Sequence, residues 1–304
     1  MTEVAANTVS QSWYEASARQ RIDALVDAGS FVEFIGPALR EKSPHLAIFD
    51  LPEQFDDGIV VGRGRLDGVP MLVAAQEGRF MGGAFGEIHG AKLTGLLRAA
   101  HALKQDLLIM FDTGGVRLQE ANAGELAIAE IMRAVIEARR AGVNVIGLIG
   151  GRAGCYGGGS LIAGTCSHLI ISEQGRLSVS GPEVIETNRG IEEFDSRDRA
   201  LVWRTMGGKH RYLIGGVDTF VDDEMLAFRQ AAIDARRAGR RCDVAMLEAE
   251  QARLERRLQR FGETKDAVEI WQTLGINDPT EVPALPTDAF LRATTDRENA
   301  DDAR

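Results

Sequence analysis

Apolar residues along the middle of the chain form a pattern that predicts strands separated by helices. The apolar runs at 106–115 and 143–151 are nearly continuous, as expected for strands buried on both faces of a parallel sheet. Between them, residues 123–141 have apolar side chains at helical spacing, which predicts an amphipathic helix. The order of strand, helix and strand therefore indicates an α/β fold with a parallel sheet covered by helices.

Segments on either side of this region add further elements. Residues 58–78 predict two strands joined by a tight turn at Asp67-Gly68, because this dipeptide favours the left-handed backbone of a hairpin turn. Helices are also expected at 12–29 and 86–105, and short strands at 168–172 and 176–180.

The last third of the chain predicts helices rather than strands. Two are expected at 223–238 and 243–261, followed by a short one around Trp271. The second helix has an apolar face, which consists of Leu247, Leu254, Leu258 and Phe261. This face is expected to pack on the core or on a partner subunit.

Length and composition favour one domain followed by a loose tail. The chain has 304 residues, of which 44% are hydrophobic, enough for a large core in one big domain or two small ones. We expect residues 1–277 to form a single domain that includes the helices at 223–261. Pro, Thr, Asp and Glu dominate from Asn277 onward, so residues 278–304 are expected to form a flexible tail.

Charge and cysteine content narrow the functional classes. The net charge of -10 argues against a general nucleic-acid binder, although a local basic pocket for a phosphate-bearing ligand remains open. Cys155, Cys166 and Cys242 form no CxxC pair, which disfavours a zinc ribbon or a disulfide framework and favours reduced thiols in the cytoplasm. The polar N-terminus does not resemble a signal peptide, and no apolar stretch of about 18 residues predicts a membrane span.

Two glycine-rich loops follow the two buried strands, at 113–116 and 150–159. In a parallel sheet, loops after the strand ends lie on one edge, where ligands commonly bind. The second loop leads into a helix that is expected to start near Gly158 or Gly159, and a helix start offers unpaired N–H groups. Either loop alone is explained equally well as a tight turn or as part of a ligand site. Together they favour two backbone N–H groups directed at one ligand oxygen, an oxyanion hole.

Other motif interpretations fit less well. The chain has no GxxxxGK[ST] sequence of a P-loop, and Gly151, Gly154 and Gly157 have the spacing GxxGxxG rather than the GxGxxG of a dinucleotide fold. Ser160 lacks the GxSxG context of a nucleophile and is better explained as a residue at the start of a helix. The histidines have no metal-ligand spacing, so no metal site is expected, and His89 is at most a minor candidate for a pocket residue.

Several motifs together resemble a known family. The segments FMGGAFGEIHGAKL, DTGGVRLQEA and GGRAGCYGGGSLIAG, followed by LSVSGPEVIE and LIGGVDTFVDD, are similar to the carboxyltransferase family of the crotonase superfamily. The resemblance covers roughly residues 15–235 and is greatest to the group of malonate decarboxylase beta subunits. It implies a crotonase-like (ClpP/crotonase) spiral of repeated ββα units with C-terminal helices. The chain has one such unit, whereas the active sites of this family form between two.

The resemblance also implies roles for the glycine loops. The backbone N–H groups of Gly115, Val116, Gly158 and Gly159 would form the oxyanion hole, and the candidate substrate-binding residues are Gly114, Gly157 and Tyr156. The hydroxyl of Tyr156 would either face the substrate or pack inside the protein. The segment Arg117–Glu120 would order the turn by salt bridging.

The implied reaction is the decarboxylation of a malonyl thioester to an acetyl thioester and CO2 through an enolate. The thioester would be carried on the phosphopantetheine-type arm of an acyl-carrier protein, or on CoA, with no tightly bound cofactor. The implied partners are a related gamma-type subunit and the acyl-carrier protein. Two alternatives stay open: a carboxyltransferase subunit of a biotin-dependent acyl-CoA carboxylase or decarboxylase, and a non-catalytic scaffold that completes a partner's site.

Overall fold

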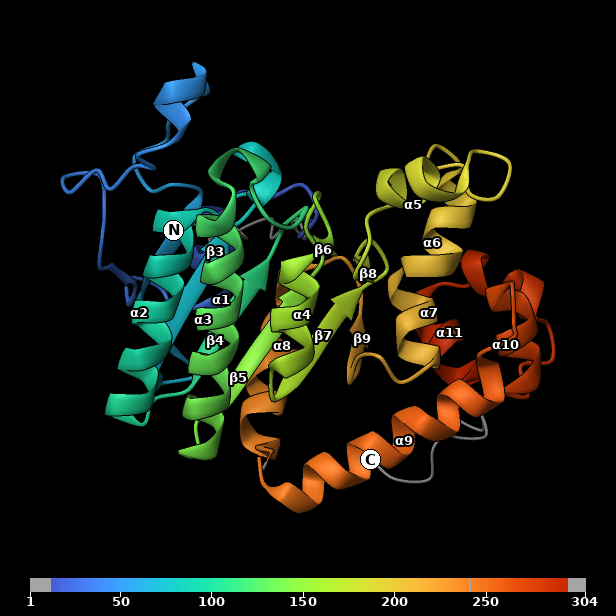
Figure 1. Cartoon of the computed structure of the whole chain (residues 1–304). Coiled ribbons are helices and arrows are strands. Elements are labelled where there is room, and N and C mark those ends of the chain that lie inside the picture. The colour runs from blue at the N-terminus through green and yellow to red at the C-terminus, as the bar shows by residue number, and fades with distance from the viewer. Residues whose placement is uncertain (1–11, 241, 295–304) are drawn as a thin grey trace, which may run out of the picture.

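A seven-stranded sheet forms the centre of the protein, as the computed structural model shows for residues 12–240 and 242–294 (Figure 1). Its order is β1-β2-β3-β4-β5-β7-β9; the first three strands pair antiparallel, and the others pair in parallel. The strands of this sheet are β1 (Val32–Glu33), β2 (Ile59–Leu66), β3 (Val69–Gln76), β4 (Leu107–Phe111), β5 (Val145–Ile149), β7 (His168–Ser172) and β9 (Thr219–Val221).

Helices cover both faces of this sheet (Figure 1). On one face lie α2 (Glu87–Leu103), α3 (Asn122–Arg140) and α4 (Gly158–Thr165), whose apolar side chains join the larger core. On the other face lie α1 (Ala18–Leu25) and α8 (Met225–Ala238), which form a second core around Trp13 and Phe228. Because β4 and β5 are buried on both faces, all their side chains can be apolar, which explains the continuous apolar runs in the sequence.

A second, smaller sheet lies beside the large one in the order of the chain, and its strands alternate with those of the large sheet. It contains β6 (Cys155–Tyr156) and β8 (Leu177–Ser178), which pair in parallel. Single bridges extend the same arrangement, from Phe85 to Val116 and from Thr113 to Cys155. Strands β3, β4, β5 and β7 are each followed by a short extended segment and then by a helix, which is the predicted ββα unit.

The predicted elements in the middle of the chain agree with the structure. The hairpin turn lies at Asp67 and Gly68, whose φ angles of 53° and 75° are both left-handed. The expected helix at 12–29 is shorter than predicted, because Ser17 caps α1 and the backbone becomes extended at Val26. Arg21 on this helix points into the protein rather than to solvent, since Asp112 pairs with it there.

The pattern predicted no element between residues 181 and 218, yet three short helices fill this region. They are α5 (Pro182–Arg189), α6 (Arg199–Met206) and α7 (Gly208–Leu213). They carry few buried apolar residues each, so their periodicity in the sequence is weak. Short 3-10 turns complete the N-terminal half: η1 (Leu46–Phe49), η2 (Met81–Gly83) and η3 (Leu118–Glu120).

The C-terminal region differs from the prediction of a flexible tail. After α9 (Val244–Phe261) and α10 (Ala267–Thr273), the chain forms η4 (Pro279–Ala284) and α11 (Thr287–Ala293). The prediction was wrong for residues 278–294, because the apolar side chains of Val282 and Phe290 are buried in the larger core. Burial of these two side chains holds the segment on the protein, although the residues around them are mostly polar. The remaining part of the expected tail, 295–304, lies outside the described residues.

Within the described residues, no helix is long and apolar enough to cross a membrane.

Candidate active site

The two glycine loops meet at one edge of the sheet. A Cβ atom on Gly115 would lie 3.5 Å from Cα of Gly157, and one on Gly157 would lie 3.2 Å from Cα of Gly115. Their φ angles, +126° and +54°, are ones that side chains other than glycine rarely adopt. The loops also touch where a Cβ on Gly159 would lie 2.4 Å from Thr113 Cγ2. Glycine is therefore required for the loops to approach each other.

Hydrogen bonds fix the first loop up to Gly115. The N–H of Thr113 donates to the carbonyl of Gly154 at 2.8 Å, and that of Gly114 donates to the carbonyl of Gly82 at 2.8 Å. The N–H of Gly115 donates to the Thr113 hydroxyl at 3.1 Å. All three donors are thus used inside the protein.

The N–H of Val116 is not used in this way. Val116 forms a parallel bridge with Phe85, but the hydrogen bonds of this bridge involve Gly115 and Arg117, the neighbours of Val116. The N–H of Phe85 donates to the carbonyl of Gly115 at 2.8 Å, and the carbonyl of Phe85 accepts from the N–H of Arg117 at 2.9 Å. In such a parallel bridge the N–H of Val116 points away from Phe85. Among the described residues this N–H has no hydrogen-bond acceptor.

The second loop supplies its N–H groups from a helix start. The N–H of Gly157 donates to the carbonyl of Val179 at 3.0 Å, and that of Ser160 donates to the carbonyl of Gly157 at 3.1 Å. Gly158 and Gly159, the first two residues of α4, have no acceptor for their N–H groups in the described part of the chain. This agrees with the predicted helix start and follows from helix geometry.

Asp112 braces the base of both loops. Its carboxylate, 3% exposed, accepts from Arg21 at 2.8 Å and from the N–H of Ala153 at 2.6 Å. It follows β4 directly, whereas Ala153 lies in the loop after β5. A Cβ on Gly78 or Gly151 would collide with it, at 2.6 and 2.2 Å. The carboxylate therefore ties α1 and two loops together at the edge of the sheet.

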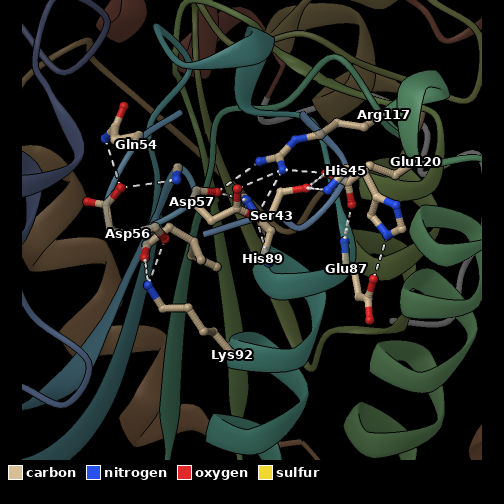
Figure 2. Close-up of polar contacts among 12 residues, drawn as sticks. Ser43, His45, Gln54, Asp56, Asp57, Glu87, His89, Lys92, Arg117 and Glu120 are labelled. Atoms are coloured by element: carbon tan, nitrogen blue, oxygen red, sulfur yellow. Dashed lines mark hydrogen bonds and ion pairs between the residues drawn. The ribbon is translucent and has the colours of Figure 1, made fainter. Parts of the chain in front are cut away.

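A buried ionic network holds the segment after the first loop (Figure 2). The guanidinium of Arg117 is 1% exposed; it donates to both carboxylate oxygens of Asp57, at 2.8 and 2.9 Å, and to Glu120 at 2.9 Å. Ser43 donates to the same Glu120 carboxylate at 2.7 Å. The implied salt bridge within Arg117–Glu120 is thus confirmed, and its role is to hold η3 in place.

Burial and hydrogen bonds shift the pKa values in this network in different directions. Burial raises the pKa of Asp57, against the opposing charge and hydrogen bonds of Arg117. Burial acts on Glu120 in the same direction, but hydrogen bonds from the Glu87 N–H and other donors outweigh it and lower the pKa of Glu120. Desolvation, followed by the charge of Arg117, lowers the pKa of His89 well below its ordinary value. His89 is therefore a neutral core residue.

The other predicted residues are placed as follows. Tyr156 is 5% exposed and packs with Phe194 and Met206, and its hydroxyl is buried without a hydrogen-bond partner among the described residues. Ser160 donates its hydroxyl to the carbonyl of Gly157 at 2.7 Å, as a residue in the first turn of a helix does. Cys155 is fully buried, and desolvation raises the pKa of its thiol well above the ordinary value.

A pocket of about 640 Å³ adjoins the second loop. Val179, whose carbonyl accepts from Gly157, forms part of its wall, and Ser160 lies at its rim on α4. The partly buried Arg211 gives the pocket a cation, and desolvation together with the nearby Arg257 lowers the pKa of Arg211 to about 10. The other polar lining residues are Ser178, Ser180, Asn188 and Arg189. The pocket thus offers an anionic or polar ligand a place beside the loops.

The sequence pattern did not predict the side chains that support the loops. Asp112 had a usable signal, because a carboxylate directly after a buried apolar strand is unusual. Asp57 had none, because 60 positions separate it from Arg117. Ser43 and the pocket residue Arg211 lie in segments without a distinctive motif.

Comparisons with known proteins agree with this geometry. The carboxyl transferase domain family matches residues 15–232. The malonyl-S-ACP:biotin-protein carboxyltransferase MADC of Malonomonas rubra is 39% identical over 303 residues, covering 92% of this chain and 95% of that protein. The propionyl-CoA carboxylase beta chain of Saccharopolyspora erythraea is 31% identical over 216 residues, which are 70% of this chain and 39% of that protein.

Solved structures show the same fold. One chain of a Pseudomonas malonate decarboxylase hetero-tetramer in complex with malonate superposes with a TM-score of 0.80 at 40% identity, covering 85% of this chain and 95% of that one. The transcarboxylase 12S structure matches with a TM-score of 0.62 at 24% identity, over 72% of this chain and 40% of that one, and supports the fold alone. The predicted crotonase-like fold is thereby confirmed. The chain belongs to the carboxyl transferase domain family and is a subunit of a decarboxylase or carboxyltransferase enzyme.

Proposed function

We propose that this chain decarboxylates a malonyl thioester and stabilises the enolate with backbone N–H groups of its two glycine loops. The observation that carries the proposal is the pair of adjacent loops whose unused donors are Val116 on one side and Gly158 and Gly159 on the other. Gly114, Gly115 and Gly157 shape the loops around the ligand. Backbone donors at a helix start stabilise developing negative charge without having to reorient during the reaction.

The chemistry needs little more than this donor pair. When the bond between the carboxylate and the α-carbon breaks, its electrons move into the thioester carbonyl, and the oxygen becomes an enolate. CO2 leaves, and a proton then adds to the α-carbon, which gives the acetyl thioester. The N–H groups bind the oxygen more strongly as its charge grows, so they lower the barrier and not merely the energy of the bound substrate.

The pocket beside the second loop is suited to part of the thioester ligand. Its partly buried Arg211 and half-polar wall fit a ligand with anionic and amide groups, such as a malonyl group on a phosphopantetheine-type arm. The name of the Malonomonas relative specifies a malonyl group on an acyl-carrier protein, which favours this carrier over CoA. The similar Pseudomonas chain belongs to a hetero-tetramer, which supports a related second subunit that closes the site.

A second function is favoured by one observation. The Malonomonas relative is named a carboxyltransferase to a biotin protein, so the carboxyl group could pass to biotin instead of leaving as CO2. The enolate and its N–H donors would be the same in both reactions. Only the acceptor of the carboxyl group differs.

The two functions are separated by assaying the chain together with its neighbouring subunits. CO2 release from malonyl-acyl-carrier protein is measured with and without avidin, which sequesters biotin. Release that is unchanged by avidin supports direct decarboxylation, and release that avidin abolishes supports transfer to biotin. A third arm supplies acyl-CoA with carboxybiotin; activity only in that arm would contradict the malonyl proposal.

The scaffold alternative needs a separate measurement. A non-catalytic subunit that only completes a partner's site would not bind the thioester by itself. Binding of malonyl thioester to the isolated chain, measured by calorimetry, would argue against a scaffold. Absence of binding, together with full activity of loop variants in the assembled enzyme, would overturn the catalytic proposal.

A further inference from the structure

The side chain of Gln76 joins three segments at the base of the first glycine loop. Gln76 is the last residue of β3 and is fully buried. Its amide oxygen accepts from the backbone N–H of Asp112 at 3.2 Å, and its amide nitrogen donates to the carbonyl of Gly83 at 3.4 Å. The same nitrogen lies 3.0 Å from Nε2 of His89 on α2. One side chain thus contacts the end of β4, the turn η2 and the first turn of α2.

Two of these segments position the first loop. Asp112 leads directly into the loop, and the carbonyl of Gly82 in η2 accepts from the N–H of Gly114 at 2.8 Å. The turn passes so close to the end of β4 that a Cβ on Gly83 would lie 1.7 Å from the carbonyl oxygen of Asp112. A side chain that moves either segment should therefore move the loop, and the N–H of Val116 with it.

The hydrogen-bond partners fix which atoms of this chain of contacts carry protons. The carbonyl of Asp57 can only accept, so Nδ1 of His89, which lies 3.1 Å away, carries the ring proton and Nε2 is an acceptor (Figure 2). The Gln76 amide must then turn its nitrogen toward His89 and its oxygen toward Asp112, whose N–H can only donate. This arrangement requires a neutral His89, because a proton on Nε2 would leave two donors facing each other.

The surroundings of His89 keep its ring neutral. The ring is fully buried, and desolvation lowers the pKa of His89 well below the ordinary value. The charged groups that face it are Asp57, which precedes β2, Arg117, which follows the first loop, and Lys92 on its own helix. Both cations act in the same direction as burial, and the hydrogen bond to the Asp57 carbonyl opposes them. The orientation of the neighbouring amide is therefore stable at neutral pH.

We propose that Gln76 is a positioning residue for the oxyanion hole: its amide, oriented by His89, holds the end of β4 where the N–H of Val116 reaches the ligand oxygen. The inference rests on the proposed function, because it assigns Gln76 a role in that same reaction. The donors at Gly158 and Gly159 are held by the other loop. Loss of the amide should thus affect one donor of the hole and lower kcat more than it raises KM, since the oxygen is most charged in the transition state.

The first test compares two replacements of Gln76 in the assembled enzyme. Gln76→Leu removes the acceptor of Asp112 and the donor to His89, so we expect kcat of CO2 release to fall about 10- to 100-fold with little change in KM. In Gln76→Glu the carboxylate and His89 share one proton, and whichever group holds it, the second oxygen still accepts from the Asp112 N–H. Gln76→Glu should therefore retain a kcat close to the wild type, and its kcat should fall only as the shared proton is lost at higher pH. Gln272→Leu is the matched control, because this glutamine is exposed on α10.

The second test reads the hydrogen-bond arrangement without an assay of activity. Nitrogen NMR of isotope-labelled histidine distinguishes the two neutral tautomers from the charged ring, and the signal of His89 is assigned by its loss in His89→Gln. We expect the neutral Nδ1–H form in the wild type at neutral pH. In Gln76→Glu the same signal should follow the loss of the shared proton, and kcat should fall with it. Circular dichroism and subunit assembly confirm that each variant is folded.

Three results would overturn the role of Gln76. The first is an Nε2–H or charged ring of His89 in the wild type, because either would be incompatible with the oriented amide. The second is folded Gln76→Leu protein with the kcat of the control. The third is a Gln76→Leu variant that raises KM and leaves kcat unchanged, which indicates ligand binding rather than positioning. A failure of the proposed function itself is recognised separately, because Val116→Pro would then also leave kcat of the assembled enzyme unchanged.

Discussion

The two glycine loops provide unused N–H groups by different physical means. In the first, the donors of Thr113, Gly114 and Gly115 are all consumed, and Val116 is left over because of its position in a bridge. In the second, Gly158 and Gly159 are unpaired simply because they begin a helix. Buried charges hold the segment after the first loop, whereas close contacts of glycines hold the second. The proposed oxyanion hole would thus depend on electrostatics in one loop and on steric fit in the other, and each should fail in its own way.

The electrostatic support of the first loop is the place where one change should have the largest effect. Arg117→Met leaves Asp57 and Glu120 buried without their cation, and removing one partner of a buried ion pair typically costs about 3–5 kcal/mol of stability. The free energy of unfolding is measured by urea denaturation. Arg133→Met, which removes an exposed arginine from α3, is the control and should unfold like the wild type. Equal stability of both variants would show that the network does not hold the loop.

Removal of the donors themselves should mainly affect the rate. Val116→Pro and Gly158→Pro each delete one N–H, and loss of one oxyanion-hole donor typically lowers kcat roughly 100- to 1000-fold. Substrate binding should fall less, because the charge on the oxygen is larger in the transition state. CO2 release by the assembled enzyme gives kcat and KM. Wild-type decarboxylation by folded, assembled Val116→Pro protein would refute the oxyanion hole.

The steric support of the second loop is tested by adding one methyl group. A Cβ on Gly159 would lie 2.4 Å from Thr113 Cγ2, so Gly159→Ala should displace the first loop and destabilise the protein by about 1–3 kcal/mol. Thr113→Ser removes the colliding methyl and keeps the hydroxyl that accepts from Gly115. The double variant should therefore regain stability and activity. If it does not, the two loops are not coupled through this contact.

The pH dependence of the network should be smaller and has a definite sign. The pKa of Glu120 is lowered in the folded protein, so its stabilising contribution is complete above the unfolded value of 4.5 and is lost as the pH falls through the folded value. Thermal unfolding of wild type and Glu120→Gln is compared between pH 7 and pH 3. The stability difference between them should shrink toward acid pH, and a constant difference would argue against an ionised Glu120.

Side chains near the loops that supply no donor should matter least. Ser160→Ala removes only a hydroxyl that bonds to its own helix turn, and Cys155→Ala removes a buried thiol that is un-ionised at neutral pH. We expect kcat of Ser160→Ala and Cys155→Ala to stay within about threefold of the wild type, since neither group contacts the proposed oxyanion. Loss of activity in Ser160→Ala would indicate a nucleophilic mechanism instead.

The sequence by itself determined the order of elements in the middle of the chain. The runs at β4 and β5 are apolar throughout because both faces are buried, and Asp67-Gly68 sets a hairpin turn locally. The glycines at 114–115 and 157–159 also revealed the loops, because the left-handed φ angles at Gly115 and Gly157 and the close contacts at Gly158 and Gly159 disfavour a Cβ. These features depend on neighbours in the sequence or on burial alone, so they can be predicted from the sequence pattern.

Only the tertiary structure decided which distant groups support the site. Asp57 meets Arg117 and Arg21 meets Asp112 across long stretches of chain, and charged residues have no periodicity that predicts such pairs. Phe290 is buried because a core surface is available to it, although its surroundings in the sequence are polar. In α9 the pattern showed an apolar face, but only the fold showed that Leu247, Leu254 and Leu258 of this face are exposed, whereas Phe261 packs against the larger core.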